Sequence, residues 1–225
     1  MNVQKSSPQP SSKRINGFSL AELMVVISVI AFLLAMAAPN IFSLMRSSEL
    51  ATQGDMFRNW LTLAQQKALS TNSDVEVRFY KFQDLDNAQP TKEFRAMQFF
   101  QYSPEGELVP ISEIYTLNDP LIFATSSSKG CNLSSILERG TETTVSDLNR
   151  FGGGIQEVSY RSFRFHPDGS TNLNMANSNS DNVQSKNWYI TMIEERPESA
   201  QTTEIYNYFS VQIDPFNGSI RTFRP

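Results

Sequence analysis

The chain has 225 residues, of which 40% are hydrophobic, and a formal net charge of −4. Three of its 19 basic residues and one of its 23 acidic residues precede Pro39, so the part from Pro39 onward carries a net charge of −6. Such an acidic chain is not expected to bind nucleic acid or anionic membranes by general charge attraction. Its length allows one membrane segment and one domain with its own core.

The N-terminus combines a short basic leader with an apolar run. Residues 1–16 are polar, with Lys5, Lys13 and Arg14 and no acidic residue, and they indicate a disordered leader. From Leu23 to Ala38 every residue except Ser28 is apolar. Together with the apolar residues just before it, this run is about 21 residues, or roughly 31 Å as a helix, which is enough to span a bilayer. The basic leader predicts a cytoplasmic N-terminus, with the rest of the chain on the far side.

Glu22 is the one charged residue at the head of this apolar run. A carboxylate in a membrane helix is unfavourable, by roughly 2.5–3.5 kcal/mol at mid-bilayer and less near the interface, so it calls for a partner. No Lys, Arg or His follows it until Arg46. The cation within reach would be a new amino terminus, made by cleavage just before Phe18, or the same amine of a neighbouring copy.

Residues 17–26, GFSLAELMVV, resemble the processing motif of type IV prepilins and type II secretion pseudopilins. The resemblance implies that a membrane prepilin peptidase cleaves after Gly17 and methylates the new terminal amine of Phe18. It also implies that Glu22, the fifth mature residue, pairs with a neighbour's terminus during assembly, and that Pro39 bends the helix. The partners implied are the peptidase, other pilin or pseudopilin subunits, an inner-membrane assembly platform and membrane lipid, with no nucleic acid and no cofactor.

Two other interpretations of the N-terminus remain open. The small-x-small triplet Ala35-Met36-Ala37 could end a conventional secretory signal, which would release a chain that begins at Ala38. The protein would then be a secreted β-rich binding domain. The apolar run could also be an uncleaved signal anchor on a single-pass membrane protein.

Past Pro39 the pattern becomes that of an amphipathic helix. Apolar residues recur at steps of three and four from Ile41 to Ala68, with charged residues between them. We therefore predict a nearly continuous helix from about Phe18 to Ser70, bent near Pro39 and loosened at Gly54. The stripe that contains Trp60 is expected to pack in a core.

The sequence pattern of the rest of the chain, residues 73–225, predicts an antiparallel β head. Alternating or buried patterns predict strands, and turn sequences such as Asn217-Gly218 separate them. The predicted strands are residues 75–80, 94–102, 108–114, 121–124, 160–165, 188–193, 206–213 and 220–223. Residues 126–154 form the least regular part, with a helical turn at 133–138, and are either a site of partner specificity or variable surface.

Few residues in the head suggest chemistry. The single histidine, His166, precedes a proline in a turn context, which excludes a site with several histidine ligands. Asp168 and Asp214 are explained by turns, and the carboxylates Glu194 and Glu195 by a solvated strand end. Cys131, the only cysteine, cannot form an internal disulfide and has no identifiable activating partner. We expect no catalytic or metal site and no enzyme activity.

The head also resembles the minor pseudopilins of the H type, on residues 75–79, 163–170 and 214–221. In its length and its ending, residues 208–225, it resembles more closely the prepilin-like D proteins of the Verru_Chthon cassette. The resemblance implies an α+β, pilin-like fold with a long N-terminal helix, spanning the membrane in its first half, packed on an antiparallel sheet. The expected parts are a leader, 1–17, a transmembrane half-helix, 18–38, an amphipathic half-helix, 39–72, and a β head, 73–225. The expected location is the inner membrane with the head in the periplasm, and a filament or the cell surface after assembly.

Overall fold

The computed structural model describes residues 18–81, 93–125, 134–145, 158–173, 188–195 and 207–225, apart from the side chains of residues 36–43 and of Arg139. The chain divides into two compact units, residues 1–45 and residues 46–225. The second unit is called the head below. The predicted boundaries at residues 17, 38 and 72 stay predictions.

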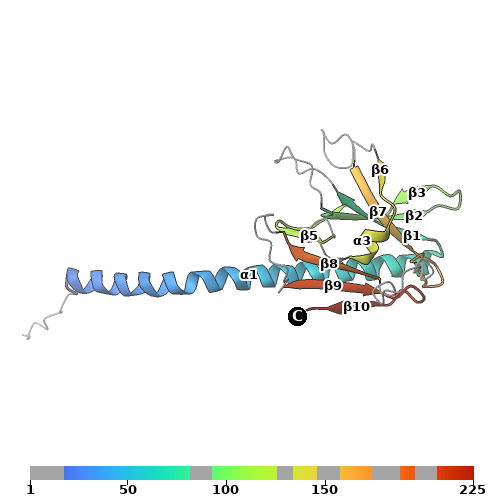
Figure 1. Ribbon diagram of the computed structural model, residues 1–225. Coiled ribbons are helices and arrows are strands. Elements are labelled where there is room, and N and C mark those ends of the chain that lie inside the picture. The colour runs from blue at the N-terminus through green and yellow to red at the C-terminus, as the bar shows by residue number, and fades with distance from the viewer. Residues whose placement is uncertain (1–17, 82–92, 126–133, 146–157, 174–187, 196–206) are drawn as a thin grey trace, which may run out of the picture. The chain divides into compact units, whose positions relative to one another are not determined.

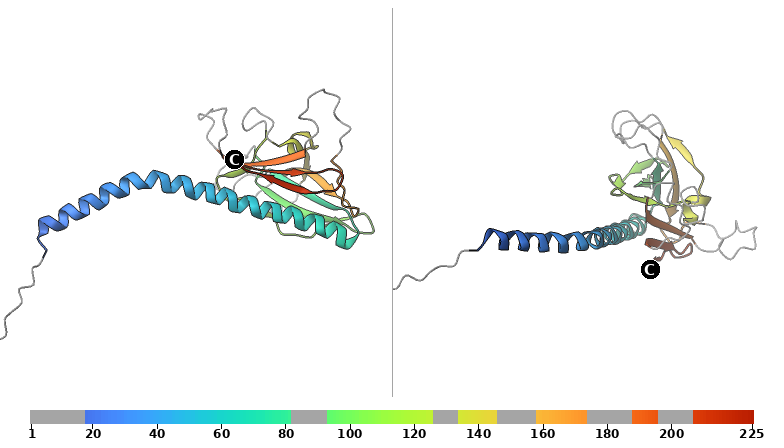
Figure 2. Two further views of the ribbon diagram at one scale, coloured as in Figure 1. Left: turned by 90° about the horizontal axis from the view of Figure 1, so that it is seen from below. Right: turned by 60° about the vertical axis from the view of Figure 1, so that its left-hand side comes forward.

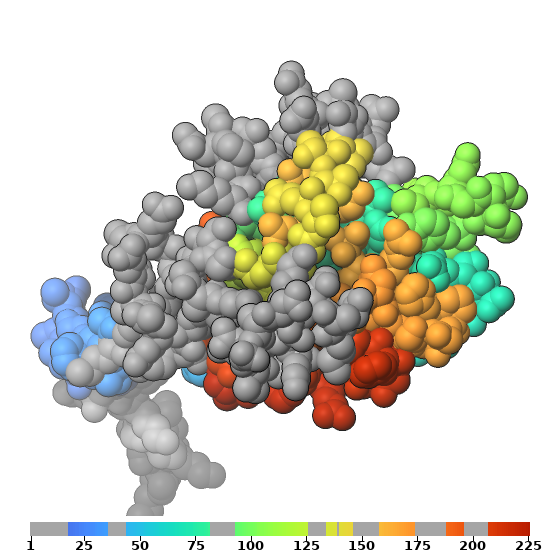
Figure 3. Space-filling view, turned by 45° about the vertical axis from the view of Figure 1, so that its right-hand side comes forward, coloured from blue at the N-terminus to red at the C-terminus, as the bar shows by residue number. Residues whose placement is uncertain are grey.

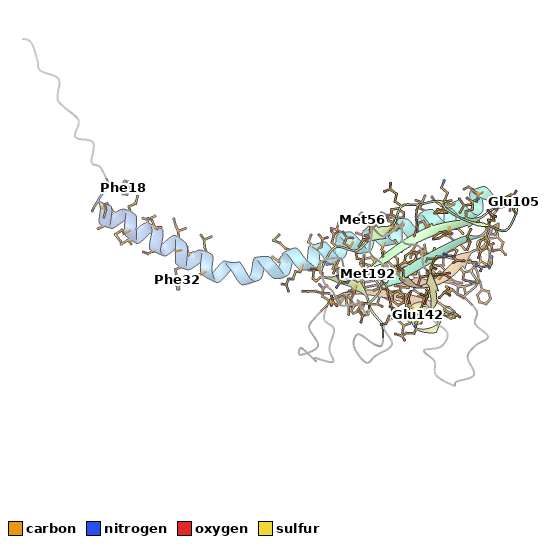
Figure 4. All side chains as sticks on the ribbon, turned by 90° about the horizontal axis from the view of Figure 1, so that it is seen from above. Phe18, Phe32, Met56, Glu105, Glu142 and Met192 are labelled. Atoms are coloured by element: carbon orange, nitrogen blue, oxygen red, sulfur yellow. The ribbon has the colours of Figure 1, made fainter. Side chains whose placement is uncertain are left out.

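Helix α1, Leu20–Thr71, runs through both units, within two residues of the predicted bounds. In the first unit every described side chain from Phe18 to Ala35 is exposed, and Figure 4 shows Phe18 and Phe32 projecting from the ribbon. Over the described residues, no helix was found with the length and apolar character needed to cross a membrane.

The head part of α1 buries one side. The buried side chains recur at intervals of three, four and seven residues, as expected for one face of a helix. They are Leu50, Phe57, Leu61, Ala64 and Ala68. Trp60 is partly buried and packs on Phe99 and Tyr115, so the prediction of a core stripe is confirmed. The helix ends before Asn72, whose positive φ of 50° is typical of a residue that follows a helix C-terminus.

The first sheet, sheet A, has six strands in the order β3-β2-β1-β7-β6, with β4 also paired to β2. All of its pairs are antiparallel. The strands are β1 Val75–Lys81, β2 Ala96–Tyr102, β3 Leu108–Pro110, β4 Tyr115–Thr116, β6 Thr143–Val145 and β7 Val158–Phe165. The prediction of a strand over 108–114 was too long, and β4 and β6 were not predicted.

The second sheet, sheet B, has four antiparallel strands in the order β10-β9-β8-β5. The strands are β5 Leu121–Phe123, β8 Trp188–Glu194, β9 Tyr208–Ile213 and β10 Ile220–Phe223. All four were predicted, to within two residues at each end. In Figure 1 and Figure 2 these strands, in orange and red apart from green β5, run beside the head part of α1.

The core of the head lies where α1 and the two sheets meet. Phe57 of α1 contacts the rings of Phe79 in sheet A and Phe123 in sheet B, with centroids 6.2 and 5.0 Å away. Phe94 forms an isolated bridge with Phe123 and so joins the two sheets. Helix α3, Ser135–Arg139, adds Ile136 and Leu137 to this core. The predicted α+β fold, a helix packed on antiparallel sheet, is confirmed.

Gly54 does not interrupt α1, contrary to the prediction that it loosens the helix. The residue is buried, and a Cβ built on it would lie 2.4 Å from the ring of Phe209 in β9. Glycine is therefore required here by the close approach of sheet B to the helix.

Candidate processing and assembly site

The start of α1 places a carboxylate against the backbone. Ser19 is the last residue before the helix, and Glu22 lies in its first turn. The Ser19 N–H donates a hydrogen bond to Glu22 Oε2 at 3.3 Å. This is one half of a capping box, in which the carboxylate three residues into the helix bonds the N–H of the capping residue. Its negative charge also matches the positive end of the helix dipole.

Ser19 was missed as a partner of Glu22. The signal was present, because Ser19-Leu20-Ala21-Glu22 has the Ser-x-x-Glu spacing of a capping box just before an apolar run. The capping contact means that Glu22 is held toward the N-terminus of its own helix. An amine created on Phe18 by cleavage would be one residue from the N–H that Glu22 already accepts.

The other predicted positions lie at or beyond the limits of the described residues. Gly17 is outside them, and Pro39 lies inside α1 at a position whose side chain is not described. Phe18 is 81% exposed. The bend at Pro39 and the role of Cys131 in residues 126–133 are therefore not tested.

In the head, the acidic residues singled out from the sequence have structural partners. Asp168 Oδ1 accepts from the backbone N–H of Ser170 at 2.8 Å, and Asp214 Oδ1 accepts from that of Phe216 at 2.9 Å. Hydrogen bonds from the Ser170 hydroxyl and backbone lower the pKa of Asp168. Turn chemistry thus explains both carboxylates, as predicted.

Glu194 and Glu195 are not simply solvated, as the sequence had indicated. Arg46 Nη1 lies 2.8 Å from Glu194 Oε1, and Arg95 pairs with both Glu195 and Asp119. These ion pairs connect the end of β8 to α1 and to the residue before β2.

His166 is held by one acidic partner. Its Nδ1 lies 2.9 Å from Asp74 Oδ1, which joins the end of β7 to the start of β1. Among the described residues, no group of three or more histidine, cysteine, aspartate or glutamate side chains is arranged to hold a metal ion.

Comparison with known proteins gives one match to a family model. The prokaryotic N-terminal methylation motif matches residues 12–38, a range that contains Gly17, Phe18 and Glu22. No protein of curated description matches the sequence significantly.

Three solved structures are distantly similar to the chain. Two are of the minor pseudopilin EpsH from the type 2 secretion system of Vibrio cholerae, at 13% and 14% identity and TM-scores of 0.39 and 0.40. They cover 79% and 80% of this chain, and 98% and 96% of their own chains are covered. The third is the type IV minor pilin FimU of Pseudomonas aeruginosa, at 9% identity and a TM-score of 0.38. The match covers 79% of this chain and 93% of the FimU chain. The family match thus shows that residues 12–38 of this chain form a prokaryotic N-terminal methylation motif.

Proposed function

We propose that the chain is a structural subunit, a minor pilin or pseudopilin, that is incorporated into a type IV pilus or a secretion pseudopilus. The observation that carries the proposal is the methylation motif over residues 12–38, in which Glu22 accepts a hydrogen bond from the Ser19 N–H at the head of an apolar helix. A prepilin peptidase would cleave between Gly17 and Phe18 and methylate Phe18. No enzyme activity is part of the proposal.

The assembly mechanism follows from the cost of an unpaired carboxylate in apolar surroundings. In a bundle of apolar half-helices, Glu22 would need a cation, and the terminal amine of an adjacent subunit supplies one. The pair would set the axial register between subunits. Before assembly, residues 18–38 would hold the subunit in the inner membrane, with the head in the periplasm.

The first experiment determines the N-terminal residue and mass of the native protein, recovered from membrane or filament fractions. A chain that begins at Phe18 and is heavier by one methyl group supports the proposal. A chain that begins at Ala38 would mean ordinary secretion, would remove Glu22 from the mature protein and would overturn it. Substitution of Gly17 by Glu should leave the leader attached, so that only the precursor mass is seen.

The role of Glu22 can be separated from its capping contact. Glu22→Gln keeps an oxygen that can accept from Ser19 N–H but removes the charge. We expect Glu22→Gln and Glu22→Ala to be processed normally and both to be absent from sheared filaments, measured by immunoblot of filament and membrane fractions. Normal incorporation of Glu22→Gln would contradict pairing with an amine.

A further inference from the structure

The side of sheet A that faces away from α1 carries a charged and aromatic cluster. Val75, Val77 and Phe79 of β1 belong to the core, so alternation turns Glu76 and Arg78 to the opposite side. Side chains of β2 and β7 complete this side. We call the set formed by Glu76, Arg78, Phe100, Tyr102, Tyr160 and Arg164 the outer cluster. In the space-filling view of Figure 3, teal, green and orange segments, the colours of residues near β1, β2 and β7, lie side by side on the face shown.

Arg78 is fixed in this cluster by two aromatic rings. Its guanidinium carbon lies 4.3 Å from the ring centroids of both Phe100 and Tyr160. Arg78 Nε donates to Glu76 Oε1 at 2.7 Å, and the side chain is only 12% exposed. Burial disfavours the charged form, but the hydrogen bond and charge of Glu76 outweigh it and raise the pKa of Arg78.

Arg164 adds a second guanidinium beside the same carboxylate. Its Nε lies 3.3 Å from Glu76 Oε2, and its guanidinium lies 4.6 Å from the Tyr102 ring centroid. The Arg164 side chain is 40% exposed. Glu76 also accepts from the Tyr102 hydroxyl at 2.9 Å and is itself only 4% exposed.

The cluster therefore has an excess of positive charge and of hydrogen-bond donors. One carboxylate, Glu76, faces two guanidinium groups, and it uses only the Nε atom of each. Because Glu76 and the Tyr102 ring hold the Arg164 guanidinium in place, less side-chain freedom remains to be lost when a ligand binds. A carboxylate fits such donors best, since two parallel N–H groups of a guanidinium match its two oxygens.

We propose that the outer cluster is a docking site for an acidic segment of a partner protein, whose carboxylates bind the half-exposed guanidinium of Arg164 beside Arg78. The net charge of −6 from Pro39 onward disfavours nucleic acid and anionic lipid surfaces, which bring many negative charges at once. A short segment with one or two carboxylates matches the local excess without that repulsion. The site does not depend on whether the chain assembles into a filament.

The test uses the full chain in detergent micelles and a dye-labelled hexapeptide of alternating Gly and Glu, with the Gly-Gln peptide as its match. Binding is measured by fluorescence anisotropy at low and at moderate salt. We expect binding of the Glu peptide that weakens with salt and is at least about tenfold tighter than binding of the Gln peptide. Equal binding of the two peptides, or no binding of either, would overturn the proposal.

Variants locate the site on the head. Arg164→Gln should weaken binding of the Glu peptide about tenfold or more, whereas Arg221→Gln, the same change at an exposed position of β10, should not. Ser162 pairs with Arg78 in the β1–β7 register, so Ser162→Glu should place a competing carboxylate on the site and block the peptide while keeping both arginines. If Arg164→Gln and Arg221→Gln bind equally and Ser162→Glu has no effect, the peptide binds elsewhere and the assignment is wrong.

Discussion

At the scale of single residues, Gly54 shows how one missing side chain joins a helix to a sheet. Glycine in a helix interior normally costs about 1 kcal/mol relative to alanine, so its replacement by alanine would ordinarily stabilise α1. Here the added Cβ would lie 2.4 Å from the Phe209 ring. The packing cost is therefore expected to exceed the helix gain.

We predict that Gly54→Ala lowers the free energy of unfolding by up to about 2 kcal/mol, since an overpacking cost of about 1–3 kcal/mol opposes a helix gain of about 1 kcal/mol. Chemical denaturation followed by tryptophan fluorescence measures it. In a Phe209→Ala background the clash is gone, so the same substitution should become neutral or stabilising. Destabilisation by Gly54→Ala in both backgrounds would contradict the explanation.

Two tyrosines are expected to ionise at a higher pH than tyrosine in an unfolded chain. Burial, then the hydrogen bond to Glu76, raises the pKa of Tyr102 to about 12, and burial, then the charge of Glu49, raises that of Tyr115 to about 12. Because the folded pKa lies above the value of about 10 for an unfolded chain, their contribution to stability is complete below pH 10 and is lost as the pH rises towards 12. In an alkaline absorbance titration, the Tyr102→Phe and Tyr115→Phe variants should each show one fewer tyrosine that ionises near pH 12 than the unsubstituted protein.

At the scale of elements, the ends of β10 are tied to α1. Gln65 Nε2 donates to the backbone oxygen of Asn217 at 3.1 Å, before β10, and Arg224 Nη2 donates to Ser47 Oγ at 3.0 Å, after it. The turn before β10 contains Gly218, which has a φ of 63°. A Cβ there would lie 2.6 Å from the backbone oxygen of Gly169.

We predict that Gly218→Ala destabilises the head by about 2 kcal/mol or more, because it combines left-handed backbone strain with a clash against backbone. Gly106→Ala is the matched control, since Gly106 also has a positive φ but nothing lies within 4 Å of its Cβ position. Gly106→Ala should cost only the backbone strain, about 1 kcal/mol. Hydrogen exchange should show loss of protection in β10 for Gly218→Ala alone. Equal effects of the two substitutions would contradict the role of crowding.

The elements that the sequence predicted well are those with a local signal. Helix α1 has a long periodic stripe, and β1, β7 and β10 lie beside strong turn residues. Strand β6 has three residues in a polar setting, too short for a pattern. The pairing of β1 with β7 and of β5 with β8 joins residues far apart in the chain, and no local pattern specifies it. The outer cluster was missed because Glu76 and Arg78 alternate with core residues, which is also the pattern of a strand with one solvent-exposed face. In the folded head, side chains of the neighbouring strands β2 and β7 bury most of their surface.

At the scale of the whole molecule, the head contains a complete core. Among the described residues, its first buried residue is Leu50, and the buried hydrophobic residues of the core lie between Leu50 and Ile213. We predict that a fragment that begins at Arg46 folds with nearly the denaturation midpoint of the full chain. A fragment that begins at Arg58 loses Leu50, Gly54 and Phe57 and should not fold. Loss of cooperative unfolding in the longer fragment would show that the first 45 residues are needed for head stability.

The contacts between α1 and sheet B also determine when the head can close during synthesis. Gln65 and Asn217 are 152 residues apart, and Ser47 and Arg224 are 177 residues apart. The apolar stripe of α1 therefore leaves the ribosome long before Phe209 and the rest of β9 exist to cover it. Contacts of such separation close slowly. A nascent chain stalled before Tyr208 would display the Leu50–Ala68 stripe without the cover of β9 and β10, as a surface that a chaperone can bind.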